Sequence, residues 1–197
     1  MFEKISETMK ARMNLLEEMD QKDRTDGTER VKRLRQIPPE TGKFLALTAA
    51  NCPEGDFIEI GTSAGYSTMW ISLAVMDRNH KLKTYELMPE KIRLAKETFK
   101  AANIEKYVEL IEGDAVENLK KLDQPIAFCF LDTEKELYQA CYDIIVPKLV
   151  QGGVLVADNG INHYETLKPM IENALHDNRV DALVVPIGKG ELVCRKR

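Results

Sequence analysis

Long apolar runs and an excess of positive charge are both missing from this sequence. No apolar run approaches the roughly 18 residues that cross a bilayer, so we expect no membrane span. The first ten residues are charged from Glu3 onward and lack the apolar centre of a secretory signal. Lysine and arginine total 28 against 32 aspartates and glutamates, a net charge of −4, which argues against a broadly basic nucleic-acid-binding surface.

Cysteines are few and form no CxxC pair. The four cysteines are Cys52, Cys129, Cys141 and Cys194. Cys129 lies inside the apolar run 126–131, where a buried, reduced thiol is expected. A chain of 197 residues, 44% of them hydrophobic, buries enough surface to fold without a disulfide framework. We therefore expect a single globular core in a reducing, cytoplasmic compartment.

Several common catalytic motifs are also absent. The histidines, His80, His163 and His176, are too far apart for an HxxxH or HExxH pair, and no phosphate-binding GxxxxGK[ST] loop occurs. No Ser-His-Asp or Cys-His signature is visible. His163 follows soon after the polar pair Asp158-Asn159, so it is a candidate to line a site there.

A regular alternation of strand and helix patterns is present after residue 43. Strands are predicted at residues 56–60, 81–86, 108–111, 126–131, 154–157, 180–186 and 191–195. Helices are predicted at residues 43–50, 65–76, 89–102, 115–122, 137–149 and 164–178. Five β-α alternations followed by a hairpin predict an α/β fold with a doubly wound, mostly parallel, seven-stranded sheet and a C-terminal antiparallel hairpin.

The start of the chain differs from this pattern. We therefore separate an N-terminal helical cap and charged segment, residues 1–36, from a main domain, residues 37–197. Apolar residues at spacings of three and four predict an amphipathic helix over residues 2–19, which either caps the core or covers a substrate or partner subunit. A basic run follows, made of Arg30, Lys32, Arg33 and Arg35. We interpret it as a solvated helix face, with the binding of an anionic group such as phosphate as the alternative.

Ligands of doubly wound sheets bind at the carboxyl ends of the strands, so the residues there are candidates. Gly61 and Gly65 follow the first strand and allow a ligand to approach a helix N-terminus closely. The dinucleotide fingerprint GxGxxG has glycine where this chain has Ser63, which disfavours an NAD site. Glu86 ends the second strand, 21 residues after Gly65, where an acid accepts hydrogen bonds from ribose hydroxyls. Together these residues predict a ribose-bearing cofactor.

Polar residues also follow the remaining parallel strands. Asp114 either caps the next helix or accepts a hydrogen bond from an adenine amino group, and the two roles are compatible. Asp132, Asp158 and Asn159 follow the fourth and fifth strands, which we expect to be neighbours. Three oxygen ligands would then converge as Mg²⁺, Ca²⁺ or Mn²⁺ requires. Lys135 lies three residues after Asp132 and is a candidate general base.

These residues resemble the class I S-adenosylmethionine-dependent methyltransferases, and specifically the small metal-dependent catechol and caffeoyl-CoA O-methyltransferases. The resemblance covers residues 36–197 and implies a Rossmann-like methyltransferase fold. It is carried by Glu40-Thr-Gly42-Lys-Phe-Leu45, Glu59-Ile-Gly61 with Gly65-Tyr-Ser67, Glu86, Asp114-Ala115, Asp132-x-x-Lys135-x-x-Tyr138, Asp158-Asn159, and Val185-Pro-Ile-Gly188-Lys-Gly190 with Cys194-Arg195.

The resemblance implies a role for each of the site residues. The residues that would bind S-adenosyl-L-methionine are Glu59, Gly61, Gly65, Tyr66, Ser67, Glu86, Asp114, Ala115 and Asp132. A divalent metal, magnesium or else calcium or manganese, would be bound by Asp132, Asp158 and Asn159. Lys135, together with Asp132, would deprotonate the acceptor, a hydroxylated small molecule of catechol type. The family also suggests a homodimer.

The chain departs from the family at one place, which leaves the acceptor open. Relatives carry a longer, substrate-contacting segment between the Asp-Asn pair and the last helix, whereas residues 160–164 run almost directly into that helix. One alternative is a tRNA hydroxyuridine O-methyltransferase, against which the acidic net charge counts. The others are an NAD-dependent oxidoreductase and a non-catalytic cofactor-binding protein.

Overall fold

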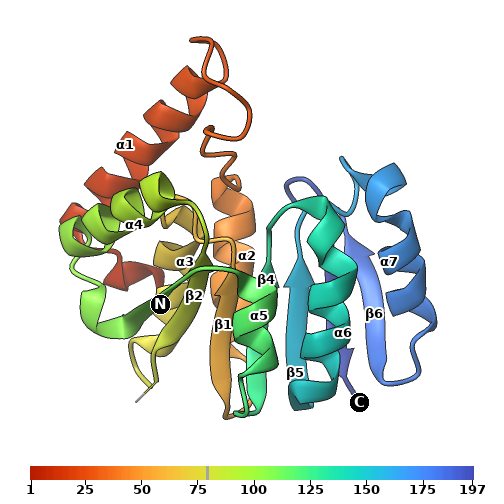
Figure 1. The fold of residues 1–197 in the computed structure, drawn as a ribbon. Helices are drawn as coiled ribbons and strands as arrows, with labels where there is room; N and C mark the ends of the chain where they lie inside the picture. Colours follow the sequence, from red (N-terminus) through yellow and green to blue (C-terminus); the bar gives the residue numbers. More distant parts are fainter. Residues whose placement is uncertain (79) are drawn as a thin grey trace.

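A seven-stranded sheet forms the middle layer of the molecule, and helices cover both of its faces (Figure 1). The computed structural model describes residues 1–78 and 80–197. The strands are β1 (Asp56–Ile60), β2 (Leu82–Glu86), β3 (Val108–Glu112), β4 (Ile126–Leu131), β5 (Leu149–Ala157), β6 (Val180–Val185) and β7 (Glu191–Lys196). The helices are α1 (Glu7–Asp23), α2 (Pro39–Ala50), α3 (Tyr66–Val75), α4 (Pro89–Ala101), α5 (Ala115–Lys120), α6 (Tyr138–Lys148) and α7 (Tyr164–His176).

The order of the strands across the sheet is β3-β2-β1-β4-β5-β7-β6. Neighbours from β3 to β5 are parallel, whereas β7 pairs antiparallel with both β5 and β6. The predicted doubly wound, mostly parallel sheet with a C-terminal antiparallel hairpin is therefore confirmed. Because the strand order reverses between β1 and β4, the carboxyl ends of these two strands mark the place where such sheets bind ligands.

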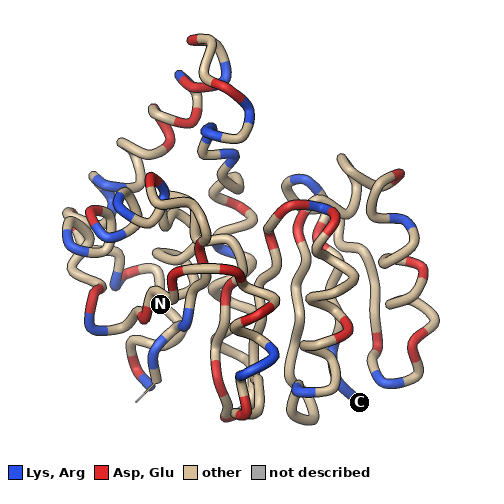
Figure 2. Tube along the Cα trace, viewed as in Figure 1, with Lys and Arg blue, Asp and Glu red and all other residues tan. Residues whose placement is uncertain are grey.

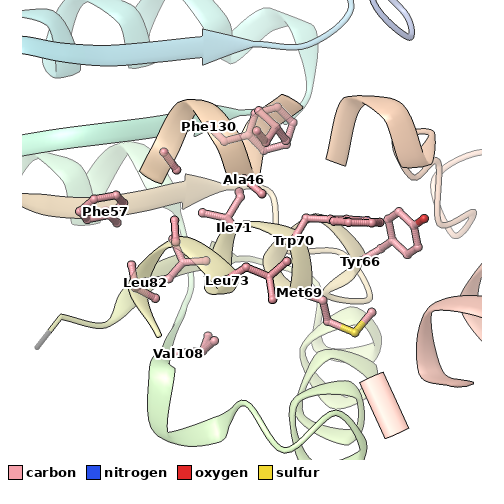
Figure 3. Close-up of a cluster of buried hydrophobic side chains, with 14 of the residues drawn as sticks. Ala46, Phe57, Tyr66, Met69, Trp70, Ile71, Leu73, Leu82, Val108 and Phe130 are labelled. Atoms are coloured by element: carbon pink, nitrogen blue, oxygen red, sulfur yellow. The ribbon is translucent and has the colours of Figure 1, made fainter. Parts of the chain in front are cut away.

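Two hydrophobic layers hold the sheet, one on each face. Alternation along β1 and β4 directs Phe57 and Phe128 toward α1, α2, α3 and α4, and Ile58 and Cys129 toward α5, α6 and α7. Figure 3 shows the first of these layers, with Trp70 of α3 among its side chains. Strand β4 is buried along its whole length, as its continuous apolar sequence predicts.

The N-terminal helix occurs, but the predicted bounds of 2–19 are wrong at both ends. The Ser6 side chain accepts a hydrogen bond from the Met9 N–H at 3.1 Å, so α1 begins only after this cap. The residues Phe2–Lys4 form a separate 3₁₀ helix. Polar residues beyond position 19 continue α1 by one more turn, in which Asp20 is buried, and the apolar spacing alone does not reveal this turn.

Helix α1 packs on the core as a cap. Met9, Met13 and Leu16 are buried and belong to the first hydrophobic layer. Side-chain hydrogen bonds add to this packing: Arg12 Nε donates to Thr98 Oγ1 of α4 at 3.0 Å. The helix therefore shares its apolar face with the elements of the sheet domain.

Two other elements begin earlier than predicted. Helix α2 begins at Pro39 rather than at residue 43, because proline suits the first turn of a helix. Strand β5 begins at Leu149 rather than at residue 154 and follows α6 directly. Its ladder with β4 contains a register shift, and Gly152 in this stretch has a φ of +78°. The irregular stretch interrupts the hydrophobic pattern from which the strand was predicted.

Residues 24–37 are not helical, so the interpretation of the basic run as a solvated helix face is wrong. Two carboxylates of α1 bind the backbone of this segment instead. Asp23 Oδ2 accepts from the Leu34 N–H at 2.6 Å, and Asp20 Oδ1 accepts from the Gln36 N–H at 3.1 Å. These N–H groups are thereby satisfied without a helical ladder.

Charge is spread over the molecule rather than concentrated. Acidic and basic residues are interspersed along the helices and connecting loops, as Figure 2 shows. All four cysteines are buried. Within residues 1–78 and 80–197, no helix has both the length and the apolar character needed to cross a membrane.

Candidate active site

A cavity of about 820 Å³ opens at the carboxyl ends of the central parallel strands. Most predicted site residues line it: Gly61, Tyr66, Ser67, Glu86, Asp114, Ala115, Asp132, Lys135 and Asn159. His163 lines it as well, whereas Glu59, Gly65 and Asp158 are buried and do not reach its wall. The structure thus brings most of the predicted cofactor residues and both predicted catalytic residues to one cavity.

The turn after β1 brings the backbone into close contact with neighbouring elements. Gly61 has a φ of +99°, and a Cβ atom there would collide with the carbonyl oxygen of Asp132. Gly65 has a φ of +84°, and its Cβ would lie 2.7 Å from Cε1 of Phe99. Both positions therefore require glycine for conformation and for space.

Glu59 anchors this turn. Its fully buried carboxylate accepts hydrogen bonds from the hydroxyls of Ser67 and Thr68 at 2.5 Å each and of Thr84 at 2.7 Å. Burial raises the pKa of Glu59 to about 7. The bonds tie the first turn of α3 to β1 and β2, which holds the N-terminus of α3 at the cavity.

Glu86 presents its carboxylate to the same turn. Its Oε2 accepts from the Ser63 N–H at 2.8 Å, and its Oε1 accepts from the Leu87 and Met88 N–H groups at 2.9 Å each. A carboxylate oxygen has two lone pairs in its plane, so Oε1 is already fully used and Oε2 can still accept from one hydroxyl group in the cavity.

Asp114 caps α5, because its Oδ1 accepts from the Glu117 N–H at 2.9 Å. The predicted cap is confirmed. Asp114 and Ala115 also line the cavity, so the contact with adenine stays a compatible prediction.

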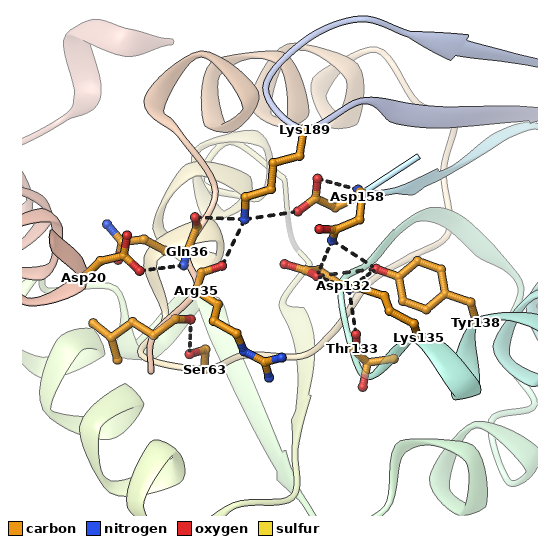
Figure 4. A network of polar contacts seen from close by, with 12 residues as sticks. Asp20, Arg35, Gln36, Ser63, Asp132, Thr133, Lys135, Tyr138, Asp158 and Lys189 are labelled. Atoms are coloured by element: carbon orange, nitrogen blue, oxygen red, sulfur yellow. Dashed lines mark hydrogen bonds and ion pairs between the residues drawn. The ribbon is translucent and has the colours of Figure 1, made fainter. Parts of the chain in front are cut away.

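A lysine-centred cluster lies at the end of β4 (Figure 4). Lys135 opens a 3₁₀ helix, and its Nζ donates to Asp132 Oδ1 at 3.2 Å and to Tyr138 OH at 3.0 Å. Asn159, after β5, donates from Nδ2 to the same Asp132 oxygen at 3.1 Å. The ends of β4 and β5 therefore converge, as the sequence predicts.

Asp158 is completely buried beside this cluster. Its Oδ1 accepts from the Asn159 N–H at 2.6 Å, and its Oδ2 has no hydrogen-bond partner among the described residues. Burial, followed by the charge of Asp132, raises the pKa of Asp158. Glu191 is also fully buried, and burial together with the Asp158 carboxylate raises its pKa.

The donor set at this end of the cavity fits a divalent cation. Asp132, Asp158 and Asn159 offer only oxygen ligands, which suit magnesium, calcium or manganese. The buried Oδ2 of Asp158 is an unsatisfied acceptor that a cation would satisfy. No three His, Cys, Asp or Glu side chains of the described chain converge as a metal site, so a cation here would have two carboxylates and one amide as its side-chain ligands.

Residues 34–36, which we call the strap, are joined to both sides of the cavity. Ser63 Oγ donates to the Leu34 carbonyl at 3.1 Å, and Arg35 Nη2 donates to Glu134 Oε1 at 2.5 Å. Arg35 has a φ of +53°, which is uncommon for a residue with a side chain. The strap therefore lies between the turn after β1 and the lysine-centred cluster.

The charged side chains at the cavity include some that the sequence analysis does not single out, among them Lys91, Glu134 and Lys189. Lys91 is 7% exposed, and burial, with repulsion from Arg35, lowers its pKa. Lys189 Nζ lies 3.7 Å from Asp158 Oδ2. The sequence contains one signal that predicts Lys189 as a site residue. It lies in the glycine turn of the terminal hairpin, and that turn returns to the ligand-binding end of the sheet.

The fold and the site are those of class I S-adenosylmethionine-dependent methyltransferases. The fold is the doubly wound sheet with its terminal hairpin, and the site combines the glycine turn, the strand-end acid and the lysine cluster around one cavity. The chain belongs to the O-methyltransferase family, because a model of that family matches residues 6–197. It is therefore an S-adenosylmethionine-dependent O-methyltransferase of the catechol and caffeoyl-CoA type.

Sequence relatives agree with this assignment. The chain is 30% identical over 151 residues to a catechol O-methyltransferase of Niastella koreensis, which covers 72% of this chain and 68% of that protein. It is 29% identical over 126 residues to a catechol O-methyltransferase of Mycobacterium tuberculosis, which covers 64% of this chain and 57% of that protein. The second match spans less than two thirds of that relative.

Solved structures share the fold. An O-methyltransferase from Bacillus cereus in complex with S-adenosylhomocysteine has a TM-score of 0.79 at 20% identity and covers 95% of this chain and 91% of that one. A methyltransferase from Podospora anserina, also bound to S-adenosylhomocysteine, has a TM-score of 0.81 at 21% identity, with 98% and 89% covered.

Proposed function

We propose that the chain methylates a hydroxyl group of a small, metal-chelating acceptor such as a catechol. The observation that carries the proposal is the contact of Lys135 Nζ with Asp132 in the wall of the cavity that Glu86 also lines. A proton acceptor and the candidate cofactor residues therefore share one space, as in-line transfer requires.

The cofactor residues have complementary parts in this proposal. S-adenosyl-L-methionine supplies an electrophilic sulfonium methyl group when it is bound. The turn at Gly61 leaves room for its methionine part at the N-terminus of α3, and Glu86 accepts hydrogen bonds from the ribose hydroxyls. Asp114 and Ala115 face the adenine.

Lys135 acts as the general base of the reaction. In its neutral form it would accept the proton of the acceptor hydroxyl, so that the oxygen could attack the methyl group of the bound donor, whose sulfur would leave as a neutral thioether. Asp132 and Tyr138 hold the amine in place, since both lie within hydrogen-bonding distance of Nζ.

A divalent cation is part of the proposal because the oxygen ligands fit it. It would supply Lewis acidity toward the acceptor hydroxyls. Asp132, Asp158 and Asn159 would hold it next to Lys135, and two vicinal hydroxyls are the acceptor arrangement that chelates such an ion. The relatives whose names state catechol O-methyltransferase support this choice of acceptor.

Transfer of a labelled methyl group to catechol and to its isomer resorcinol tests the proposal. The two acceptors have the same atoms, but only the vicinal hydroxyls of catechol can chelate a metal. We expect methylation of catechol with Mg²⁺, little methylation of resorcinol, loss of turnover with EDTA and recovery with excess Mg²⁺.

Three results would contradict parts of the proposal. Equal rates for the two isomers would exclude chelation by the acceptor. Full activity of an Asp158→Ala variant in EDTA would exclude the metal. Methylation of tRNA without methylation of any catechol would overturn the small-molecule acceptor.

A further inference from the structure

Lys189 brings a fixed positive charge to the proposed metal ligands. It lies in the turn between β6 and β7, and its Nζ is 3.7 Å from Asp158 Oδ2 (Figure 4). The same Nζ donates to the carbonyl oxygens of Arg35 and Gln36 at 3.2 Å each. The ammonium group therefore joins the terminal hairpin, the strap and a buried carboxylate.

Lys189 supplies a counter-charge to the buried carboxylate of Asp158. Asp158 is completely buried, and a buried carboxylate without a counter-charge is costly. In the described part of the chain, Lys189 is the only basic side chain within 4 Å of an Asp158 oxygen. It faces the same oxygen that has no hydrogen-bond partner.

We propose that Lys189 is a positioning residue whose ammonium group competes with a divalent cation for Asp158. The inference rests on the metal site of the proposed function. Two cations at one carboxylate oxygen repel each other, so metal binding requires Lys189 to withdraw from Asp158 or to share it. The lysine consequently lowers the affinity of the site for the metal.

The competition also links the metal to the strap. Lys189 binds the carbonyls of two strap residues, and one of these, Arg35, pairs with Glu134 on the far side of the cavity. When the metal is absent, Lys189 holds Asp158 and the strap together. When the metal is present, the contacts of Lys189 with Asp158 and the strap are weakened, which frees the strap beside the part of the cavity where the acceptor would bind.

Titration of Mn²⁺ into the full chain with S-adenosylhomocysteine tests this inference, with calorimetry and the electron-spin-resonance signal of free Mn²⁺ as readouts. Lys189→Met keeps the length of the side chain and removes its charge. We expect it to bind Mn²⁺ about tenfold more tightly than the unmodified chain. Lys189→Arg keeps the charge and should not show this gain.

Lys168→Met is the matched control, because Lys168 is an exposed residue of α7 whose Nζ lies 3.9 Å from Glu172 of the same helix. It should leave Mn²⁺ affinity unchanged. Unchanged or weaker binding by Lys189→Met, with intact affinity for S-adenosylhomocysteine, would overturn the inference.

The same preparations separate this inference from the proposed function. If catechol methylation is sensitive to EDTA but Lys189→Met gains no affinity, only the role of Lys189 is refuted. If Lys189→Met gains affinity while no catechol is methylated, the competition holds and the proposed acceptor is wrong.

Discussion

At the scale of single residues, the active site depends on polar atoms held at short range. Lys135 Nζ has Asp132 Oδ1 at 3.2 Å, a main-chain carbonyl at 3.0 Å and Tyr138 OH at 3.0 Å as acceptors. Three partners fix the amine at one point of the cavity wall. In the proposed function Lys135 is the general base, and a base held by three partners contributes to the rate without contributing to cofactor binding.

Lys135→Met is therefore expected to lower kcat by about 10²–10⁴-fold. The affinity for S-adenosylhomocysteine, measured by calorimetry, should change little because the proposed function places Lys135 at the acceptor and not at the cofactor. Lys121→Met, which alters the residue that follows α5, is the control and should keep full activity. An equal loss of cofactor affinity and of kcat in Lys135→Met would contradict the assignment of the base.

The raised pKa of Glu59 predicts that the free energy of unfolding depends on pH. Its pKa is about 7 in the folded chain against an ordinary value of 4.5, so folding favours the protonated acid. This stabilisation is fully present below the unfolded pKa and is lost as the pH rises through about 7. We expect the free energy of unfolding to fall over this range by about 3 kcal/mol more in the unmodified chain than in Glu59→Gln.

Urea unfolding at several pH values measures this difference. Glu112→Gln is the control, since the Glu112 side chain is 54% exposed and should give the same profile as the unmodified chain. Parallel profiles for Glu59→Gln and the unmodified chain would show that Glu59 does not titrate in this range.

At the scale of elements, the turn from β1 to α3 depends on close packing of main-chain atoms. Gly61 has a left-handed φ, and a side chain would meet the carbonyl of Asp132. The main chain of the turn thus packs directly against the main chain that follows β4. Main-chain atoms cannot move aside as a flexible side chain can.

Gly61→Ala should destabilise the chain by more than about 2 kcal/mol and weaken binding of S-adenosylhomocysteine. Gly27→Ala is the matched control, because Gly27 also has a left-handed φ, +88°, but no atom of residues 1–78 or 80–197 would lie within 4 Å of a Cβ at this position. It should cost about 1 kcal/mol and leave binding unchanged. Thermal unfolding and calorimetry measure both effects, and equal costs at the two sites would refute the steric argument.

At the scale of the whole molecule, α1 is part of the same core as the sheet domain. Met13 is 4% exposed and belongs to the hydrophobic layer that also contains Phe57 and Phe128. The cap and the sheet should therefore unfold together in one transition.

Met13→Ala is expected to lower the free energy of unfolding by about 2–5 kcal/mol, because it leaves a cavity in this layer. Leu15→Ala changes a neighbouring residue that is 44% exposed and should stay within about 0.5 kcal/mol. Urea unfolding measures both variants. An unchanged midpoint for Met13→Ala would mean that α1 is a detachable cover.

Much of the fold was determined by the sequence itself. The apolar run of β4, the glycines after β1 and the acids at the strand ends are local patterns, and hydrophobic periodicity places them on strands, turns and helix starts. The alternation of strands and helices predicts a topology in which the ends of β4 and β5 lie side by side. The sequence therefore predicts that Lys135, Asp132 and Asn159 lie at one site.

Only the tertiary structure decided what depends on partners distant along the chain. Arg35 and Glu134 are 99 residues apart, and Lys189 reaches a strap more than 150 residues earlier. The strap is not helical because Asp20 and Asp23 accept hydrogen bonds from its N–H groups. Local helix propensity does not predict these bonds. Hydrophobic patterning acts over a few residues, whereas the charges around Asp158 acquire their positions only when the sheet, the hairpin and the strap pack together.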